Sequence, residues 1–145
     1  MFAQLEPKRI WVDRLNIRLA RAETGAVEED YSIDVSPKVW ASKDRRSFKV
    51  RVPITMKPAP DATCRYSKIE VFATGVFDIA PDTPEEMVRQ LVPLNCYVIL
   101  YGFARGVVAQ VTGLNPGGPF LLPALNFLKL LHADNAEGSP AEDQS

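Results

Sequence analysis

Apolar and polar residues alternate along four stretches in the first part of the chain, at residues 9–19, 31–40, 48–56 and 66–79. A period of two predicts β-strands that have one covered and one open face. No helical period separates these stretches, so we predict a four-stranded antiparallel sheet covered on one side. Because helical patterns follow the strands, the predicted fold class is α+β.

Each predicted strand has an expected inward face. For the first strand the inward residues are Trp11, Leu15, Ile17 and Leu19, with Asp13 as the exception, and the outward residues are Val12, Arg14, Asn16 and Arg18. The third and fourth strands are predicted to turn inward Phe48, Val50, Val52, Ile54, Met56, Ile69, Val71 and Ala73. Pro37 interrupts the second stretch, which is typical of an edge strand because proline lacks the N–H that a ladder needs.

The segment DTPEEM, residues 82–87, predicts the start of a helix. Thr83 is predicted to cap it, Pro84 suits the first helical position, and Glu86 completes a capping box. Pro93 is predicted to end this short helix, because proline breaks the helical hydrogen-bond pattern.

Three further elements are predicted after this break. A longer helix is expected from about residue 96 to 112, with Gly113 following its last turn. PALNFLKLL, residues 123–131, predicts a final short helix, and the polar end of the chain predicts a disordered acidic tail. The expected organisation is therefore one folded domain over residues 1–133 and a tail over residues 134–145.

The longer predicted helix carries a stripe of small residues, namely Gly102, Gly106, Ala109 and Gly113. Glycine inside a helix costs about 1 kcal/mol relative to alanine, which is tolerable where another backbone must approach closely. From the residues alone, two interpretations stay open at even odds. The stripe packs onto the sheet of the same chain, or it meets another chain.

The chain carries a formal net charge of −1, unevenly placed, with 14 Lys or Arg against 10 Asp or Glu in residues 1–70 and 3 against 8 in residues 71–145. Such asymmetry favours different partners for different faces, but it falls short of a nucleic-acid-binding protein. GPFLLPALNFLKLL, residues 118–131, is strongly apolar, yet prolines interrupt it and it is too short to span a bilayer. No membrane insertion is expected. The first residues have no basic-then-apolar leader, so a cytoplasmic location is expected.

The sequence lacks the sets of residues that enzymes commonly use for catalysis. Its single histidine, His132, adjoins the predicted tail, where a solvated side chain is expected. There is no nucleophile–base set, no Cys/His cluster and no phosphate loop, so no metal or cofactor is expected. Cys64 and Cys96 lie among apolar or small residues and are predicted to be buried thiols rather than a disulfide.

The order of these pieces resembles the SecB family of export chaperones over roughly residues 8–131. RIWVDRLNIRL is similar to the opening strand of the family, and GVFDIA is similar to the end of its fourth strand. Met87 and Leu91 match the start of its first helix, Phe103-Ala104-Arg105 matches its Tyr-Ala-Arg, and LLPALNF resembles its Leu-Ala-Pro-Val-Asn-Phe.

The resemblance implies a holdase that needs no ATP and binds unfolded or nascent polypeptide clients. It implies a homotetramer built as a dimer of dimers, whose long helix packs against copies of itself, so that Gly102, Gly106 and Ala109 form the oligomer interface. The expected client-binding residues are Trp11, Tyr31, Val35, Trp40, Phe120, Leu122 and Phe127. For each of them singly, packing in the core is about equally plausible.

The chain departs from the family on the outward face of the sheet. The export family places acidic residues there to meet the translocation motor, whereas the matching positions here are Arg14 and Arg18, with Lys68 beside Glu70. These four residues are the expected partner-binding face, and its basic character makes binding of the motor doubtful. Some relatives guard antitoxins in toxin–antitoxin systems, so a chaperone dedicated to an antitoxin is the alternative to a role in protein export.

Overall fold

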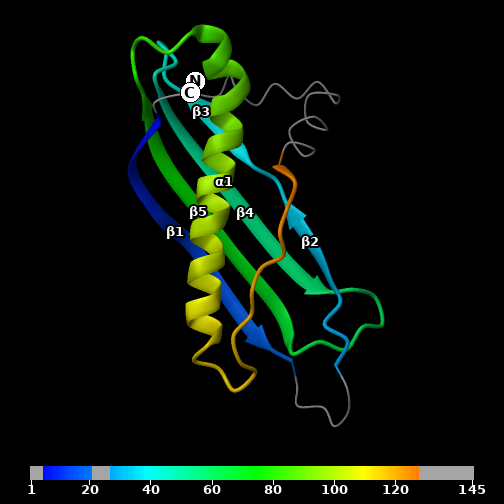
Figure 1. The fold of residues 1–145 in the computed structure, drawn as a ribbon. Helices are drawn as coiled ribbons and strands as arrows, with labels where there is room; N and C mark the ends of the chain where they lie inside the picture. Colours follow the sequence, from blue (N-terminus) through cyan, green and yellow to red (C-terminus); the bar gives the residue numbers. More distant parts are fainter. Residues whose placement is uncertain (1–4, 21–26, 128–145) are drawn as a thin grey trace.

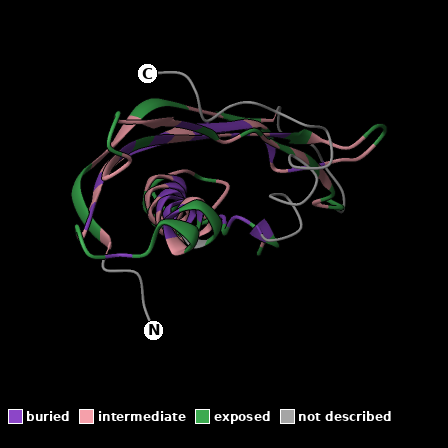
Figure 2. Cartoon of the chain, turned by 90° about the horizontal axis from the view of Figure 1, so that it is seen from above, coloured by how far each residue is buried: buried purple, intermediate pink, exposed green. Residues whose placement is uncertain are grey.

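Five strands form one antiparallel sheet in the computed structural model, which describes residues 5–20 and 27–127. They are β1 (Leu5–Leu19), β2 (Tyr31–Val35), β3 (Lys38–Ala41), β4 (Ser47–Pro58) and β5 (Tyr66–Ile79). Their order is β1-β5-β4-β2, with β3 also paired to β4, so β5 and β4 are central (Figure 1). The helix α1 (Glu85–Thr112) covers one face, and Figure 2 shows it on the concave side of the curved sheet. The predicted α+β class is confirmed.

The two central strands have the inward faces that the sequence predicts. The side chains of β4 at Phe48, Val50, Val52, Ile54 and Met56 are buried, as are those of β5 at Ile69, Val71 and Ala73. Each large apolar side chain that leaves water on folding contributes roughly 1.5–3 kcal/mol. This strictly alternating set fixes the register of β4 against β5, because a slip of one residue would turn every apolar side chain outward.

The predicted second strand, residues 31–40, is present as two short strands that share one partner. β2 pairs with residues 54–58 of β4 and β3 pairs with residues 48–51, so both run antiparallel along the same edge of β4. The break between them contains Pro37, as the sequence indicates. These two strands and β1 form the edges of the sheet.

The predicted faces of β1 are wrong for residues before Asp13. Val12 pairs with Ala73 and Arg14 pairs with Phe72, so Asp13 is an extra residue in the ladder, a β-bulge. The bulge reverses the alternation. Leu15 and Ile17 lie on the helix side as predicted, but Val12 lies there too, while Trp11, opposite Thr74, lies on the outer face of the sheet.

The prediction of two helices separated by Pro93 is wrong, because α1 runs without a break from Glu85 to Thr112. A proline inside a helix removes one hydrogen bond and costs about 3 kcal/mol. The buried stripe of α1 crosses this position, with Val88 and Val92 before it and Cys96 after it. Burial of these side chains against the sheet therefore offsets the cost of the proline.

The start of α1 also differs from the predicted capping box. The N-cap residue is Pro84, and no side chain caps the helix. Thr83 is instead buried in the preceding turn, where its carbonyl oxygen accepts a hydrogen bond of 3.0 Å from Nη1 of Arg46. The first turn does carry Glu85 and Glu86, whose charges complement the positive end of the helix. The predicted end is confirmed, with Gly113 as the C-cap residue.

After α1 the chain runs back in an extended form between the helix and β2, drawn orange in Figure 1. Residues 123–126 are not helical, so the predicted helix over 123–131 is wrong for them, and only Phe127 has helical geometry. Tyr101 and Arg105 hold this part of the segment extended, because their side chains donate hydrogen bonds to the carbonyl oxygens of Pro123 and Leu122. Residues 128–131, His132 and the predicted tail over 134–145 lie outside the described residues.

Both cysteines are buried and free, as predicted from the sequence. Burial raises the pKa of the Cys96 thiol to about 12, so this thiol is protonated at neutral pH. Within α1, Val92–Thr112 has the length and mean hydropathy, 1.4, of a membrane-spanning helix. In this fold the helix packs on the sheet, and 39% of that window is buried.

Candidate functional site

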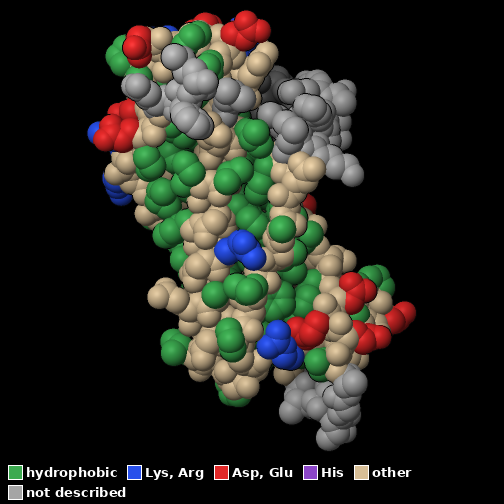
Figure 3. Space-filling model, in the orientation of Figure 1, with side chains coloured by type: hydrophobic (Ala, Val, Ile, Leu, Met, Phe, Trp, Pro, Cys, Tyr) green, Lys and Arg blue, Asp and Glu red, His purple; other side chains and the backbone are tan. Residues whose placement is uncertain are grey.

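An open cavity of about 420 Å³ lies between the edge strand β2 and the extended segment that follows α1. Its lining residues come from four parts of the chain, and they are Glu29, Asp30, Tyr31, Met56, Arg65, Phe120, Leu121 and Pro123. We call this cavity the edge groove. Figure 3 shows the helix side of the molecule, on which hydrophobic side chains are widespread and charged side chains gather at the lower right.

The edge groove has an apolar wall built around Phe120. The ring of Phe120 meets Tyr31 edge-on at 5.1 Å and Tyr66 at 6.0 Å between centroids. Next to it, Leu121 leaves 66% of its surface exposed, which is unusual for so large an apolar side chain. The groove therefore offers aromatic and aliphatic surface to a ligand without any rearrangement of the core.

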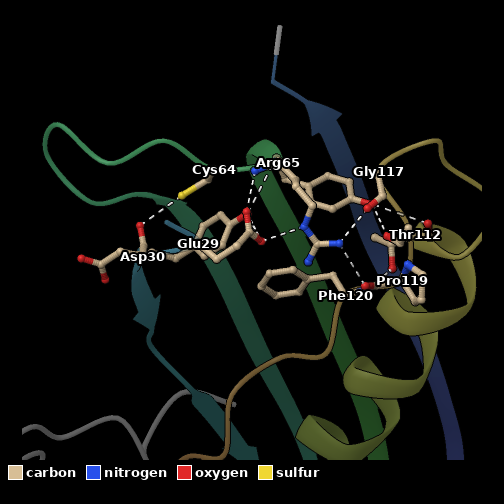
Figure 4. Close-up of polar contacts among 11 residues, drawn as sticks. Glu29, Asp30, Cys64, Arg65, Thr112, Gly117, Pro119 and Phe120 are labelled. Carbon is tan, nitrogen blue, oxygen red and sulfur yellow. Dashed lines mark hydrogen bonds and ion pairs between the residues drawn. The ribbon is translucent and has the colours of Figure 1, made fainter. Parts of the chain in front are cut away.

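The other end of the edge groove is polar, and Arg65 organises it. The carboxylate of Glu29 accepts hydrogen bonds from the backbone N–H of Arg65 at 2.6 Å and from its Nε at 2.9 Å. Nη1 of Arg65 donates to the carbonyl oxygen of Gly117 at 2.7 Å (Figure 4). The guanidinium also lies over the ring of Phe120, 5.9 Å from its centroid. One side chain thus joins the entry to β2, the start of β5 and the segment that carries the apolar wall.

The same contacts set the ionisation of two groove residues. Burial by itself raises the pKa of the Glu29 carboxyl, but the hydrogen bonds and charge of Arg65, with the Tyr31 hydroxyl, hold this pKa below its ordinary value. Burial, together with the charge of Glu29, raises the pKa of Tyr31. Glu29 is therefore charged and Tyr31 protonated at neutral pH, the states in which the hydroxyl can donate to the carboxylate.

Hydrogen bonds from α1 and β5 hold the backbone of the extended segment. The hydroxyl of Thr112 accepts from the N–H of Phe120 at 2.8 Å, and the hydroxyl of Tyr66 donates to Gly118 at 2.5 Å. Further along, the side chains of Arg105 and Tyr101 donate to the carbonyl oxygens of Leu122 and Pro123. Gly118 has a φ of +85°, which suits glycine best.

The predicted client-binding residues do not form one site. Tyr31 and Phe120 line the edge groove, although Phe120 is buried in the core, as Leu122 and Phe127 are. Val35 is half-buried on the helix side of β2, opposite Ile54. Trp11 and Trp40 lie on the outer face of the sheet, away from the groove.

Sequence reasoning missed six of the eight lining residues, namely Glu29, Asp30, Met56, Arg65, Leu121 and Pro123. The sequence gives no signal for Leu121, because residues 120–122 are all apolar and only the structure shows that buried and exposed side chains alternate there. Nothing in the sequence indicates that Arg65 pairs with Glu29, since the two are far apart along the chain.

The predicted partner-binding residues do share the outer face of the sheet. Arg18 lies opposite Lys68, Asn16 lies opposite Glu70, and Arg14 lies in the next row towards the bulge. Glu70 is 8% exposed and forms ion pairs of 3.8 Å with both Arg14 and Lys68. By register and contacts, the cations of this face are Arg9, Arg14, Arg18, Lys38, Lys49, Arg51, Lys57 and Lys68, against Glu6, Asp13, Asp34, Glu70 and Asp78.

The predicted oligomer-interface glycines face away from the sheet. A Cβ atom at Gly102 or Gly106 would meet nothing within 4 Å, so packing onto the sheet of the same chain does not explain these glycines. Ala109 is half-buried beside them. Val98, one turn before Gly102, is 53% exposed. Around Val98, Gly102 and Gly106 the solvent side of α1 is therefore apolar and without large side chains, a surface that commonly marks a protein contact.

Across residues 5–20 and 27–127 no group of three or more His, Cys, Asp or Glu side chains could hold a metal ion. Among the polar groups of the edge groove, the carboxylate of Glu29 accepts hydrogen bonds from both Arg65 and Tyr31. What the site presents is exposed apolar surface beside an edge strand, which is the character of a surface that binds polypeptide.

The sequence profile of the SecB family, described as preprotein translocase subunit SecB, matches residues 4–138. The chain therefore belongs to the SecB family, and the resemblance stated from the sequence is confirmed. Proteins of this family are chaperones and not enzymes. The expectation that this chain is not an enzyme is confirmed by its membership.

Relatives and solved structures agree with this assignment. The protein-export protein SecB of Acidithiobacillus ferrooxidans is 28% identical over 127 residues, covering 88% of this chain and 83% of that protein. That of Paramagnetospirillum magneticum is 32% identical over 77 residues, covering 53% and 48%. The SecB-like chaperone of Mycobacterium tuberculosis, solved with a ChAD peptide from the HigA1 antitoxin, is 21% identical, with a TM-score of 0.65 and coverage of 85% and 91%. At that identity the structural match supports the fold.

Proposed function

We propose that this protein is a holdase that binds unfolded or nascent polypeptides in the edge groove and needs no ATP. The observation that carries the proposal is the edge groove itself, with Leu121 exposed beside the aromatic pair of Tyr31 and Phe120. Protein export from the cytoplasm is the task that best fits the named relatives. The absence of a phosphate loop in the sequence supports independence from ATP.

The mechanism follows from two adjacent surfaces. Apolar client side chains would leave water mainly on Leu121 and on the half-buried ring of Tyr31, at roughly 25 cal/mol for each Å² buried. β2 is the last strand in the sheet order, so its outer backbone edge has no strand partner among the described residues. An extended client segment can add hydrogen bonds there. Hydrogen bonds to the backbone of a client do not depend on the client's sequence. Many different clients can therefore bind weakly in the edge groove.

Leu121→Asp is expected to abolish most of the suppression of aggregation of a chemically unfolded test protein, measured by light scattering. A charge in the groove must be desolvated when an apolar client segment binds. The matched control is Leu114→Asp, because Leu114 is 86% exposed in the loop after α1 and does not line the groove. ATP is expected to change neither result. Equal loss of activity in both variants would contradict binding in the edge groove.

Assembly into a homotetramer, as a dimer of dimers, is the second part of the proposal. The open space at Gly102 and Gly106 supports it, because two helices can approach closely only where side chains are small. A tetramer would also multiply the number of edge grooves, so that one client chain is held at several points.

Gly106→Leu is expected to reduce the molar mass from about four chains to that of a smaller species, because leucine overpacks a close helix contact. The measurement is light scattering coupled to size exclusion. Gly106→Ala is the control that distinguishes an effect on assembly from an effect on folding. Alanine meets nothing within the chain, so in an isolated subunit it would stabilise the helix by about 1 kcal/mol. A wild-type protein with the mass of a single chain would end the proposal of a tetramer.

A second candidate function is protection of an antitoxin in a toxin–antitoxin system. Two observations favour it. The outer face carries Arg14 and Arg18 where the export family is acidic, which disfavours attraction of the translocation motor. The structural neighbour from Mycobacterium tuberculosis binds a peptide of an antitoxin. A toxin–antitoxin gene pair beside the gene for this chain would decide for this candidate.

A further inference from the structure

The outer face of the sheet carries a second surface that the edge groove does not use. Two neighbouring rows cross the strands there, Arg9–Val76–Lys49–Trp40 and Trp11–Thr74–Arg51–Lys38. These eight positions include both tryptophans of the chain, four cations and no carboxylate. We call Arg9, Trp11, Lys38, Trp40, Lys49 and Arg51 the tryptophan band.

Cations lie against both tryptophan rings of the band. The guanidinium carbon of Arg9 is 4.9 Å from the centroid of the Trp11 ring. Nζ of Lys49 and the guanidinium carbon of Arg51 are 5.6 Å and 5.9 Å from the centroid of the Trp40 ring. Both rings are half-buried, so each shows one surface to solvent beside a positive charge.

One carboxylate contacts the band, and its acceptor positions are occupied. Asp13, the bulge residue of β1, accepts from Nε1 of Trp11 at 2.6 Å, from Nε of Arg51 at 3.0 Å and from the hydroxyl of Thr74. Within the part of the chain that the structure describes, Arg9, Lys38 and Lys49 are exposed and form no ion pair with a carboxylate. Lys38 also lies directly opposite Arg51, an unfavourable pair of like charges.

We propose that the tryptophan band is a docking surface for an acidic segment of a partner protein, in which apolar residues alternate with Asp or Glu. Three unpaired cations would meet the carboxylates, and the two indole rings would meet the apolar residues. An extended segment of about ten residues, at roughly 3.3 Å per residue, is long enough to cross four strands spaced about 4.8 Å apart.

The charge of the molecule favours a short acidic segment over a nucleic acid. The rows on either side of the band carry carboxylates: Glu6 and Asp78 lie in the row beyond Arg9, and Glu70 and Asp34 lie two rows beyond Trp11. A nucleic acid longer than the band would extend over these carboxylates and be repelled by them. A short acidic segment meets only the cations.

Intrinsic fluorescence gives a direct test, because Trp11 and Trp40 are the only tryptophans. The probe is a synthetic peptide of about ten residues in which Asp or Glu alternates with Phe or Leu, long enough to cross the sheet. Its matched control has every acidic residue replaced by Lys. Titration of the wild-type protein with the acidic peptide is expected to give a saturable fluorescence change that weakens with added salt. The Lys peptide is expected to give none.

Substitutions then test whether the acidic peptide binds at the tryptophan band. Arg9→Glu combined with Lys49→Glu is expected to raise the Kd of the acidic peptide by at least about tenfold, measured by anisotropy of a dye-labelled copy. Arg89→Glu, an exposed cation on α1 outside the band, is expected to leave the Kd unchanged. Leu121→Asp is also expected to bind the peptide normally, so loss of the groove and loss of the band are distinguishable. Equal binding of both peptides, an unchanged Kd in the double variant, or tighter binding of a single-stranded oligonucleotide would overturn the proposal.

Discussion

Leu122→Ala is expected to lower the free energy of unfolding by about 2–5 kcal/mol, the range for removal of a fully buried leucine side chain. Leu122 has 0% of its surface exposed and lies in the core together with Phe120 and Phe127. The segment that carries it has no ladder of backbone hydrogen bonds to a strand, so side-chain burial contributes much of its attachment. Urea unfolding followed by circular dichroism, at one fixed protein concentration, measures the effect.

Leu121→Ala is the matched control for this substitution. The neighbouring side chain is mostly exposed, so its removal is expected to change the free energy of unfolding by no more than about 0.5 kcal/mol. In a client-binding assay the order of the two effects is expected to reverse, because Leu121→Ala removes exposed groove surface and weakens binding. Similar losses of stability in both would contradict the division of this segment into buried and exposed residues.

Arg65→Met is expected to lower the free energy of unfolding by about 2–3 kcal/mol, because it removes hydrogen bonds to a charged group and leaves Glu29 without its ion pair. It also removes the bond from Nη1 to Gly117, so the wall of the edge groove loses its anchor. Client affinity should therefore fall together with stability. Glu29→Gln and the double variant complete a cycle that isolates the pair.

The pH dependence of this pair has a defined sign. The pKa of Glu29 is lower in the folded protein than its ordinary value of 4.5, so the folded state binds the carboxylate's proton less tightly than the unfolded state does. The stability that it contributes is therefore fully present above about pH 4.5 and is lost as the pH falls through the folded-state pKa. Wild type and Glu29→Gln should differ at pH 7, and the difference should shrink as the pH falls below about 4.5. A difference that stays constant over this range would contradict the assignment.

The sequence predicts the centre of the sheet well, and the reason is burial. β4 and β5 have neighbours on both sides and a helix over one face, so every second residue had to be apolar. β1 has only one neighbour, and a single extra residue reversed its alternation. The polar Asp13 on a supposedly apolar face was the one sign of the bulge in the sequence. Because the prediction assumed a strict period of two along β1, it placed Trp11 on the inward face, whereas Trp11 lies on the outer face of the sheet.

Predictions from short sequence patterns failed where contacts between residues far apart in the chain determine the structure. Pro93 favours a broken helix, but burial of α1 outweighs it. The sequence of residues 123–131 favours a terminal helix, but hydrogen bonds from Arg105 and Tyr101 hold the backbone at Leu122 and Pro123 in an extended form. For the edge groove, the aromatic composition indicated Tyr31 and Phe120. The pairing of Arg65 with Glu29 depends on how the chain crosses from β1 to β2, which no short sequence pattern encodes.

The position of β1 at one edge of the sheet has a consequence for how the protein folds during its synthesis. β1 precedes the other described strands along the chain, yet among the described residues it pairs with β5 alone, and Leu5 pairs with Ile79 while Leu19 pairs with Tyr66. Strands β3, β4 and β5 follow one another and can pair early, whereas closure of β1 requires contacts between residues 47 to 74 positions apart. Until β5 emerges from the ribosome, the apolar side of β1 has nothing to cover it. Each newly made chain therefore passes through a stage in which it displays the kind of exposed, extended segment that its finished form is proposed to hold.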